Sequence, residues 1–303
     1  MTSTTHKRLL HKLAAHGIRD ELLFWIENWL SDRKQRVTLN GHCSSWKDVL
    51  SGVPRGSVLG PLLFVIYIND IDESVACKIL KFADDTKIFR VVNSQDDIDR
   101  LRNDLKNLGA WSEDWQMLFN ANICKVVHIG YNNSHADYYM CGNNLEAVDE
   151  ERDLGVIVSK DLKWEKQCSQ AVKKANRMLG VIKRNFDDRS METIMPLYKS
   201  LVRPHLEYCV PIWNPYYKKD IELIEGVQRR ATKLVEGVRN LHYEERIKKL
   251  NLMPLEIRRH KSDLIETFKI INGCYNLQSD LLFTFAEGQR RGHSKKLCKN
   301  AVD

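Results

Sequence analysis

Two adjacent carboxylates, Asp84 and Asp85, are the residues of this 303-residue chain best suited to chemistry. They stand between two short runs of β-forming residues, so we expect them at a tight bend where both side chains reach one cleft. Neighbouring carboxylates repel each other, and a bound divalent cation such as Mg²⁺ relieves that repulsion. Two such ions, about 3.5–4 Å apart, can activate a 3′-hydroxyl and stabilise a leaving pyrophosphate. The alternative interpretation is that Asp-Asp is an ordinary turn dipeptide that binds nothing.

The segments around this pair predict a mixed α/β unit that extends to about residue 158. Residues 77–92 favour a β-hairpin bent at the two aspartates, and Asn40-Gly41 predicts the turn of an earlier hairpin. Residues 124–131 are expected to form a further strand. Helical periodicity predicts helices at residues 7–18 (broken at Gly17), 19–35, 61–70 and 95–117.

From about Lys160 the pattern becomes helical, which predicts a second unit over residues 159–303. Residues 163–186 and 221–238 each carry an apolar stripe on one side and Lys or Arg on the other. A last helix is expected to begin at Pro254 and to end at Gly273. The predicted fold class is α+β, with an antiparallel sheet and its helices followed by an all-α region.

The composition is that of a globular protein, with 43% hydrophobic residues, 29% charged residues and a formal net charge of +7. Such a modest excess favours a nucleic-acid partner only if the basic residues gather on one face. The eight cysteines form no CxxC pair, which argues against a zinc site and favours free thiols. No apolar run approaches the roughly 20 residues of a membrane helix, and no signal sequence is recognisable. We therefore expect an intracellular protein of the nucleus or cytoplasm, neither secreted nor membrane-bound.

Several motifs resemble those of reverse transcriptases from LINE-type (non-LTR, jockey-like) retrotransposons. SGVPRGSVLGPLLF, which begins at Ser51, is similar to the family motif GxPQGSxLGPLLF, and Phe82-Ala83-Asp84-Asp85 is similar to its [YF]xDD turn. WSEDWQMLFNANICKVVHIG resembles the next palm motif, and ERDLGVIVSKDLKW resembles the start of the thumb. The resemblance implies a partial polymerase palm over residues 1–158 and a helical thumb with a C-terminal extension over residues 159–303. It also implies a Mg²⁺-dependent polymerase that adds dNTPs to a DNA primer on an RNA template.

Carried over position by position, the resemblance makes Asp84 a catalytic metal ligand and Asp85 its neighbour in the same metal site. The residues that it places near nucleotide or template are Arg55, Gly56, Ser57, Gly60, Phe82 and Lys125. The residues that it places along nucleic-acid phosphates are Lys166, Lys173, Lys174 and Arg177. For each of these cations, the alternative is a solvated surface residue without a ligand.

The chain departs from the family pattern near its start. The first palm motif of the family supplies an aspartate that faces the [YF]xDD pair, and residues 6–10 match only the tail of that motif. Arg55 also stands where the family usually has Gln, and Ile123 where it often has Lys. Because fewer oxygen ligands hold divalent ions less well, we expect this polypeptide alone to be inactive as a polymerase.

Two other hypotheses stay open at this point. The chain could be a non-catalytic, nucleic-acid-binding remnant of a retroelement that uses its basic helices without turnover. It could instead have no selected role, because a sheet that lacks strands leaves backbone groups unpaired and is unstable.

Overall fold

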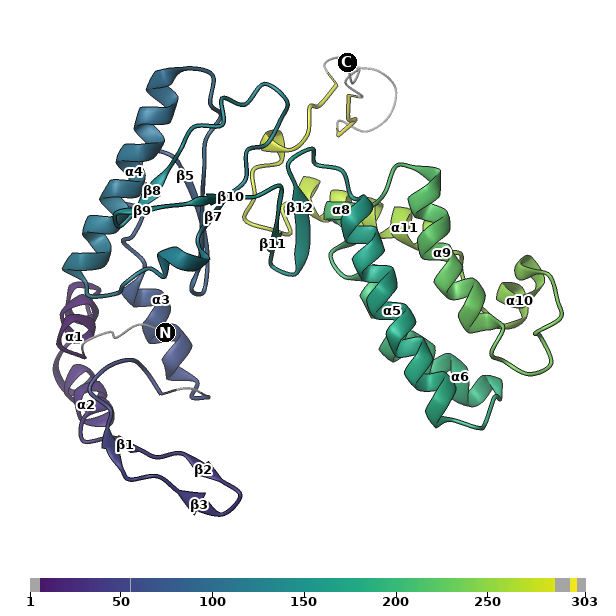
Figure 1. Cartoon of the computed structure of the whole chain (residues 1–303), viewed down its shortest axis with the longest axis horizontal. Coiled ribbons are helices and arrows are strands. Elements are labelled where there is room, and N and C mark those ends of the chain that lie inside the picture. Colours follow the sequence, from purple (N-terminus) through teal and green to yellow (C-terminus); the bar gives the residue numbers. More distant parts are fainter. Residues whose placement is uncertain (1–5, 55, 287–294, 299–303) are drawn as a thin grey trace. The chain divides into compact units, whose positions relative to one another are not determined.

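The computed structural model describes residues 6–54, 56–286 and 295–298, and the chain divides into two compact units, Met1–Asp149 and Glu150–Asp303 (Figure 1). The division falls before the hairpin of β11 (Glu150–Asp153) and β12 (Val156–Ser159), whereas the sequence pattern suggested a division after it. This hairpin belongs to the second unit because β12 packs against the first long helix of that unit.

The helices of the first unit lie close to where the periodicity predicted them. They are α1 (His6–Ala15), α2 (Asp20–Leu30), α3 (Leu59–Tyr67) and α4 (Gln95–Asp114). Gly17 separates α1 from α2 with a φ of +86°, which glycine adopts without steric cost. α4 begins with a capping box, in which Ser94 and Asp97 each accept a hydrogen bond from the backbone of the other.

The strands of the first unit are short. They are β1 (Lys34–Gln35), β2 (Thr38–Leu39), β3 (His42–Cys43), β4 (Lys47–Asp48), β5 (Lys78–Phe82), β6 (Asp85–Phe89), β7 (Lys125–Val126), β8 (Tyr139–Met140), β9 (Asn143–Asn144) and β10 (Glu146–Ala147).

Every strand in the described ranges belongs to a two-stranded sheet, and β5–β6 is the longest ladder of the first unit. Both predicted hairpins are present, one bent at the aspartates and one turning at Asn40-Gly41. The predicted strand over residues 124–131 is wrong for most of its length. Only β7 forms, in parallel with β10, because the chain then turns back and the His128 ring bonds to Asn133 at 3.0 Å. The α+β class is confirmed, with a sheet content that consists of small ladders.

A buried lysine connects three helical segments of the first unit. Lys12 on α1 is 4% exposed, and its Nζ donates to the Tyr67 carbonyl and to the Asp70 carboxylate, each at 2.5 Å. The same ammonium lies 3.8–4.8 Å from the ring centres of Tyr67, Trp111 and Trp115. Burial lowers the pKa of Lys12, and the hydrogen bond to Asp70 opposes that effect. Since a buried charge is tolerated only when it is paired, Lys12 ties α1 to the end of α3 and to α4.

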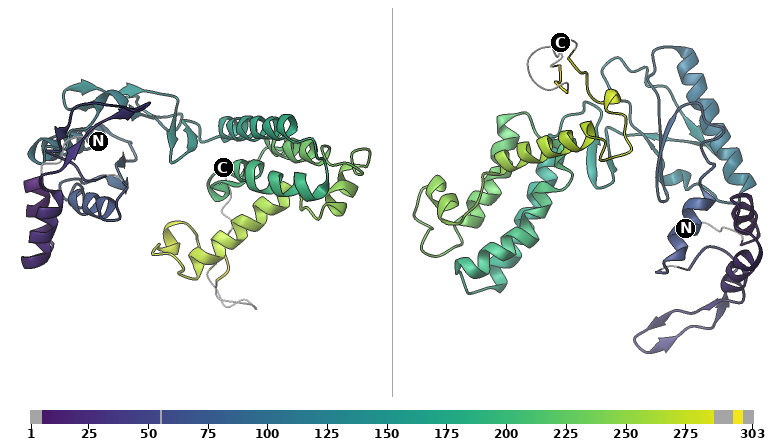
Figure 2. Two further views of the ribbon diagram at one scale, coloured as in Figure 1. Left: turned by 90° about the horizontal axis from the view of Figure 1, so that it is seen from below. Right: turned by 180° about the vertical axis from the view of Figure 1, so that it is seen from behind.

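The second unit is helical after the β11–β12 hairpin. Its helices are α5 (Glu165–Asn185), α6 (Met191–Leu197), α7 (Pro204–Glu207), α8 (Val210–Trp213), α9 (Lys218–Thr232), α10 (Tyr243–Lys249) and α11 (Leu255–Ile271), with a π-helical turn at Tyr198–Val202 between α6 and α7. α5 and α9 run side by side (Figure 2). Ala171, Ala175 and Ala231 are buried in the shared core, and such small side chains let two helices approach closely. The helices predicted over residues 163–186 and from Pro254 to Gly273 are confirmed, whereas the helix predicted over residues 221–238 ends early, at Thr232.

A buried arginine holds the C-terminal helix of the second unit in place. The Arg259 guanidinium lies 4.1 Å from the ring centre of Trp213 and donates to the Leu206 carbonyl at 2.5 Å and to Asn214 Oδ1 at 2.9 Å. Burial lowers the pKa of Arg259 to about 10. None of the helices in the described part of the chain has the length and apolar character needed to cross a membrane.

Replacing Lys12 with alanine should destabilise the first unit by about 3 kcal/mol, because Asp70 and the Tyr67 carbonyl lose their buried donor. The measurement is urea denaturation followed by tryptophan fluorescence. Lys7→Ala is the matched control, since Lys7 lies exposed on the same helix and its loss should shift the midpoint little. Equal midpoints for the two variants would contradict this account of the core.

Candidate functional site

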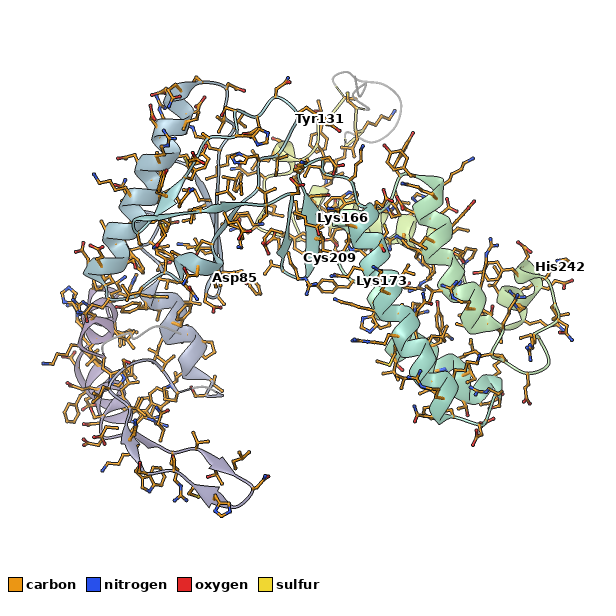
Figure 3. The ribbon with its side chains drawn as sticks, viewed as in Figure 1. Asp85, Tyr131, Lys166, Lys173, Cys209 and His242 are labelled. Carbon is orange, nitrogen blue, oxygen red and sulfur yellow. The ribbon has the colours of Figure 1, made fainter. Side chains whose placement is uncertain are left out.

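The two aspartates lie at the tip of the β5–β6 hairpin, where Figure 3 labels Asp85. Ala83 and Asp84 form the two-residue turn, and Phe82 pairs with Asp85 across it. Ala83 has a φ of +52°, in the left-handed region that residues with a side chain occupy at a cost. Two-residue hairpins require such a backbone, so the strain coincides with the point that carries both carboxylates.

Both side chains of the pair face solvent. Asp84 and Asp85 are exposed, and across the ranges that the structure describes neither carboxylate takes part in a hydrogen bond or ion pair. The two groups are therefore available to an external cation.

The pair fits the donor chemistry of a hard divalent cation but supplies only part of a coordination sphere. Mg²⁺ takes about six oxygen ligands, commonly one or two carboxylates with water and substrate phosphates. Within the described residues, no group of three or more His, Cys, Asp or Glu side chains could hold a metal ion. An ion at this turn would thus depend on water or phosphate oxygens for its other ligands.

Three charged side chains hold the hairpin in place. Lys81 Nζ donates to the Asn69 carbonyl at 2.9 Å and to Asp72 Oδ1 at 2.7 Å, and this hydrogen bond lowers the pKa of Asp72. Asp104 on α4 accepts the backbone N–H groups of residues 76 and 77, at 3.1 and 2.7 Å. The chain just before β5 is thereby fixed to α4, and the end of β5 is fixed to the segment after α3. No sequence motif singles out any of these three residues.

The glycine-rich loop before α3 is held by Ser57. Its Oγ donates to the Pro54 carbonyl at 2.8 Å and accepts from the Gly60 N–H at 2.9 Å. A Cβ at Gly60 would lie 2.7 Å from the Pro54 oxygen, so a larger residue has no room there. Gly56 is exposed with a φ of +78°, which glycine adopts readily, and Arg55 lies outside the described residues.

The other two candidates of the first unit have different surroundings. Phe82 is 64% exposed and lies beside the aspartates at the hairpin tip. Lys125 instead forms an ion pair with Glu146, its partner across the β7–β10 ladder. The structure therefore brings Phe82 together with the acidic pair, and Lys125 is already engaged by an acidic neighbour.

The basic candidates of the second unit lie along α5, where Figure 3 labels Lys166 and Lys173. Lys166 forms an ion pair with Glu150 at 2.5 Å. Lys173, Lys174 and Arg177 are exposed.

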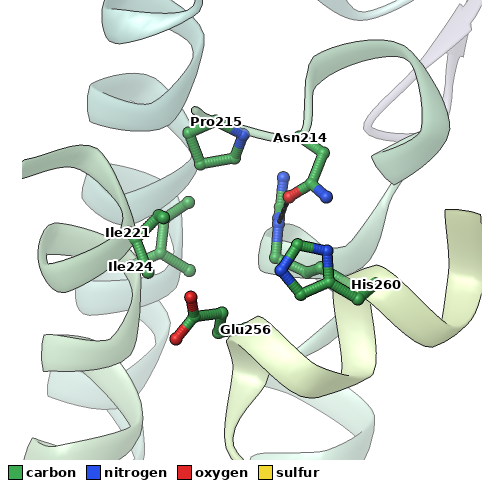
Figure 4. A pocket seen from close by; sticks show the side chains of 7 residues that line it. Asn214, Pro215, Ile221, Ile224, Glu256 and His260 are labelled. Atoms are coloured by element: carbon green, nitrogen blue, oxygen red, sulfur yellow. Dashed lines mark hydrogen bonds between the residues drawn. The ribbon is translucent and has the colours of Figure 1, made fainter. Parts of the chain in front are cut away.

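Two pockets of the second unit were not anticipated from the sequence. One is lined by Lys174 together with Gln170, His205 and Tyr208. The other lies beside Arg259, between α9 and α11 (Figure 4). Its volume of about 10 Å³ admits no more than a water molecule, so it is not a ligand site.

Comparison with known proteins identifies the family. Residues 3–182 match the family model described as reverse transcriptase (RNA-dependent DNA polymerase). The chain is 27% identical over 254 residues to an RNA-directed DNA polymerase from the mobile element jockey of Drosophila funebris, covering 77% of this chain and 27% of the relative. It is 23% identical to a probable RNA-directed DNA polymerase from the transposon X-element of Drosophila melanogaster, covering 78% and 28%.

The chain thus spans a little over a quarter of the length of these curated relatives. The matched region extends from the start of α1 to the last turn of α5 and includes both the glycine-rich loop and the acidic hairpin tip. Because this match covers more than half of the residues, the chain belongs to the reverse transcriptase (RNA-dependent DNA polymerase) family, of the LINE type that its motifs predicted.

Proposed function

We propose that the chain forms part of the polymerase palm, over residues 1–158, and the thumb with a C-terminal extension, over residues 159–303, of a non-LTR retrotransposon reverse transcriptase. The observation that carries this proposal is the exposed Asp84–Asp85 pair on a strained, firmly anchored hairpin tip inside the family match. The substrates would be an RNA template, a DNA primer and dNTPs.

In this proposal Asp84 is the main ligand of Mg²⁺, and Asp85 is a less critical neighbour in the same site. Bound Mg²⁺ would supply charge neutralisation for the phosphates and activation of the primer hydroxyl. Phe82, exposed beside the pair, packs against the primer terminus. Gly56 and Ser57 line the floor under nucleotide and template, and the Ser57 hydrogen bonds keep that floor rigid.

The thumb in this proposal binds the phosphate backbone of the primer–template. Lys173, Lys174 and Arg177 support this role because they are exposed along one helix. Lys166 would contribute less, since Glu150 already neutralises part of its charge. Fixed cations of this kind give affinity without sequence preference.

Asp84→Asn should weaken metal binding at least tenfold, because an amide replaces a charged oxygen ligand. The readout is Mn²⁺ binding, followed by electron spin resonance, to a complex of the chain with dideoxy-terminated primer–template and dNTP. Where the wild-type chain extends a primer on an RNA template, the same change should lower the rate by roughly 10²-fold or more. Asp114→Asn, at an exposed position, is the matched control. Unaltered Mn²⁺ binding and extension in Asp84→Asn would rule out the metal-site assignment.

Replacing Lys173, Lys174 and Arg177 together with alanine should weaken primer–template binding and lower its dependence on salt. Each lost phosphate contact lowers the slope of log K against log salt by roughly 0.7–0.9. The measurement is fluorescence anisotropy at salt concentrations from about 50 to about 200 mM. The control is Lys248→Ala/Lys249→Ala, which removes two exposed cations from α10.

Binding that survives in Asp84→Asn but is lost in the triple variant, without any extension by the wild type, would favour the non-catalytic alternative. An unchanged slope in the triple variant would exclude this face of α5 from nucleic-acid binding.

A further inference from the structure

The earlier hairpin of the first unit extends from the end of α2 as an exposed arm (Figure 1). We define the arm as residues 31–48. The β1–β4 ladder forms its base and the β2–β3 ladder its tip, and all of its residues are exposed. An arm with so little buried surface contributes little to the core, so its composition reflects its contacts with solvent or with a partner.

The arm is basic. Arg33, Lys34, Arg36 and Lys47 lie within residues 33–47, which contain no Asp or Glu, and Asp32 and Asp48 flank this stretch, so the whole arm carries a formal net charge of +2. Asp48, just beyond them, reaches Lys34 at 3.9 Å, but both side chains are more than 60% exposed, so this pair is weak. The arm therefore presents a small excess of positive charge and is complementary to a polyanion.

The arm also exposes tryptophan beside its cations. Trp46 is 58% exposed, and the Arg36 guanidinium lies 4.6 Å from its ring centre. At the base, Arg33 lies 5.4 Å from the ring centre of Trp29, which stacks with Trp25 at 6.4 Å and an interplanar angle of 9°. Trp25 is 50% exposed. One arginine–tryptophan pair thus lies on the arm itself and a second at its base, where Trp29 is partly buried against the core of the first unit.

The register of the β1–β4 ladder indicates which side chains of the arm project from the same face. Lys34 pairs with Asp48 and Gln35 with Lys47, so Arg36 and Trp46 come next as a cross-strand pair. Beyond this pair, Thr38 pairs with Cys43, which leaves one more residue on the second strand than on the first. Side chains alternate along a strand, so Lys34 and Arg36 project from the same face as Trp46, with Asp48 beside Lys34, whereas Arg33 and Lys47 project from the opposite face.

We propose that this face of the arm binds single-stranded nucleic acid, with Lys34 and Arg36 on phosphates and the free side of the Trp46 ring stacked on a base. Cations that follow a backbone, interleaved with exposed aromatic rings, are the means by which proteins hold single strands without reading their sequence. The inference rests on the proposed function and adds to it. It assigns a single strand of nucleic acid to a surface separate from the cations of α5. The opposite face exposes Val37 and Leu39, 71% and 70% exposed, and would suit an apolar partner instead.

The test is fluorescence anisotropy of the full chain with labelled single-stranded oligo(A) and oligo(dT) of about 20 nucleotides. Arg36→Ala/Trp46→Ala should weaken binding of single strands at least tenfold and lower its salt dependence. Val37→Ala/Leu39→Ala, on the opposite face, is the matched control and should bind as the wild type does. Weaker binding of single strands by Arg36→Ala/Trp46→Ala, with wild-type binding by Val37→Ala/Leu39→Ala, supports the proposal.

Circular dichroism melting curves that superimpose for all variants would show that the arm changes leave both units folded. Wild-type affinity for both oligonucleotides in Arg36→Ala/Trp46→Ala would overturn the inference, as would a loss of binding caused by Val37→Ala/Leu39→Ala alone. The variant with alanine at 173, 174 and 177 separates the two proposals. If it weakens duplex primer–template binding while the arm variants bind single strands normally, the proposed function stands and the inference about the arm fails.

Discussion

The acidic hairpin tip can hold a cation in a fixed place only if the hairpin itself is fixed, and paired charges on the segment between α3 and β5 provide that restraint. Asp70 accepts from the buried Lys12 on one side of this segment, and Asp72 accepts from Lys81 of the hairpin on the other. Asp104 receives the backbone N–H groups at the start of β5. The Lys12–Asp70 pair joins elements that are far apart in the sequence, and the nearby Asp72–Lys81 pair continues from there to the hairpin, so an early helix is coupled mechanically to the turn that carries Asp84.

The second strand of the hairpin is restrained in the same way. Arg90, which follows β6, donates to Asp97 from Nε and Nη2 at 3.0 and 2.9 Å. The Ser94 hydroxyl, the Asn93 N–H and Arg90 together lower the pKa of Asp97 to about 2, so this carboxylate is ionised near neutral pH. Both strands of the β5–β6 ladder are therefore anchored to α4 at the base of the hairpin, and its tip lies at the opposite end. A left-handed φ at Ala83 is sustained because the flanking strands have little freedom to relax it.

Local signals in the sequence were sufficient to predict the hairpins, most helices and the position of the acidic pair, which lies inside the region that matches the family. They failed where a distant partner decided the outcome. Lys12 follows Leu9 by three residues and precedes Leu13, which places a cation on the apolar stripe of α1, yet periodicity alone does not name Asp70 as its partner. Of the strand expected over residues 124–131, only β7 forms. β propensity depends on context, and here the chain turns back, with a hydrogen bond between the His128 and Asn133 side chains.

The pairing of cations also depends on distant partners. An amphipathic sequence pattern does not distinguish a cation that is paired within the fold from one that is only solvated. On α9, Arg229 lies over the Tyr243 ring and Arg230 bonds to Asn176 of α5, so both serve helix packing. On α5, Lys173 and its neighbours at 174 and 177 face solvent. A phosphate that bound a paired arginine would have to displace its partner and repeat the desolvation of both groups, whereas a solvated lysine loses only water and a counterion. By this criterion, the exposed cations of α5 are better placed to bind phosphate than the arginines of α9.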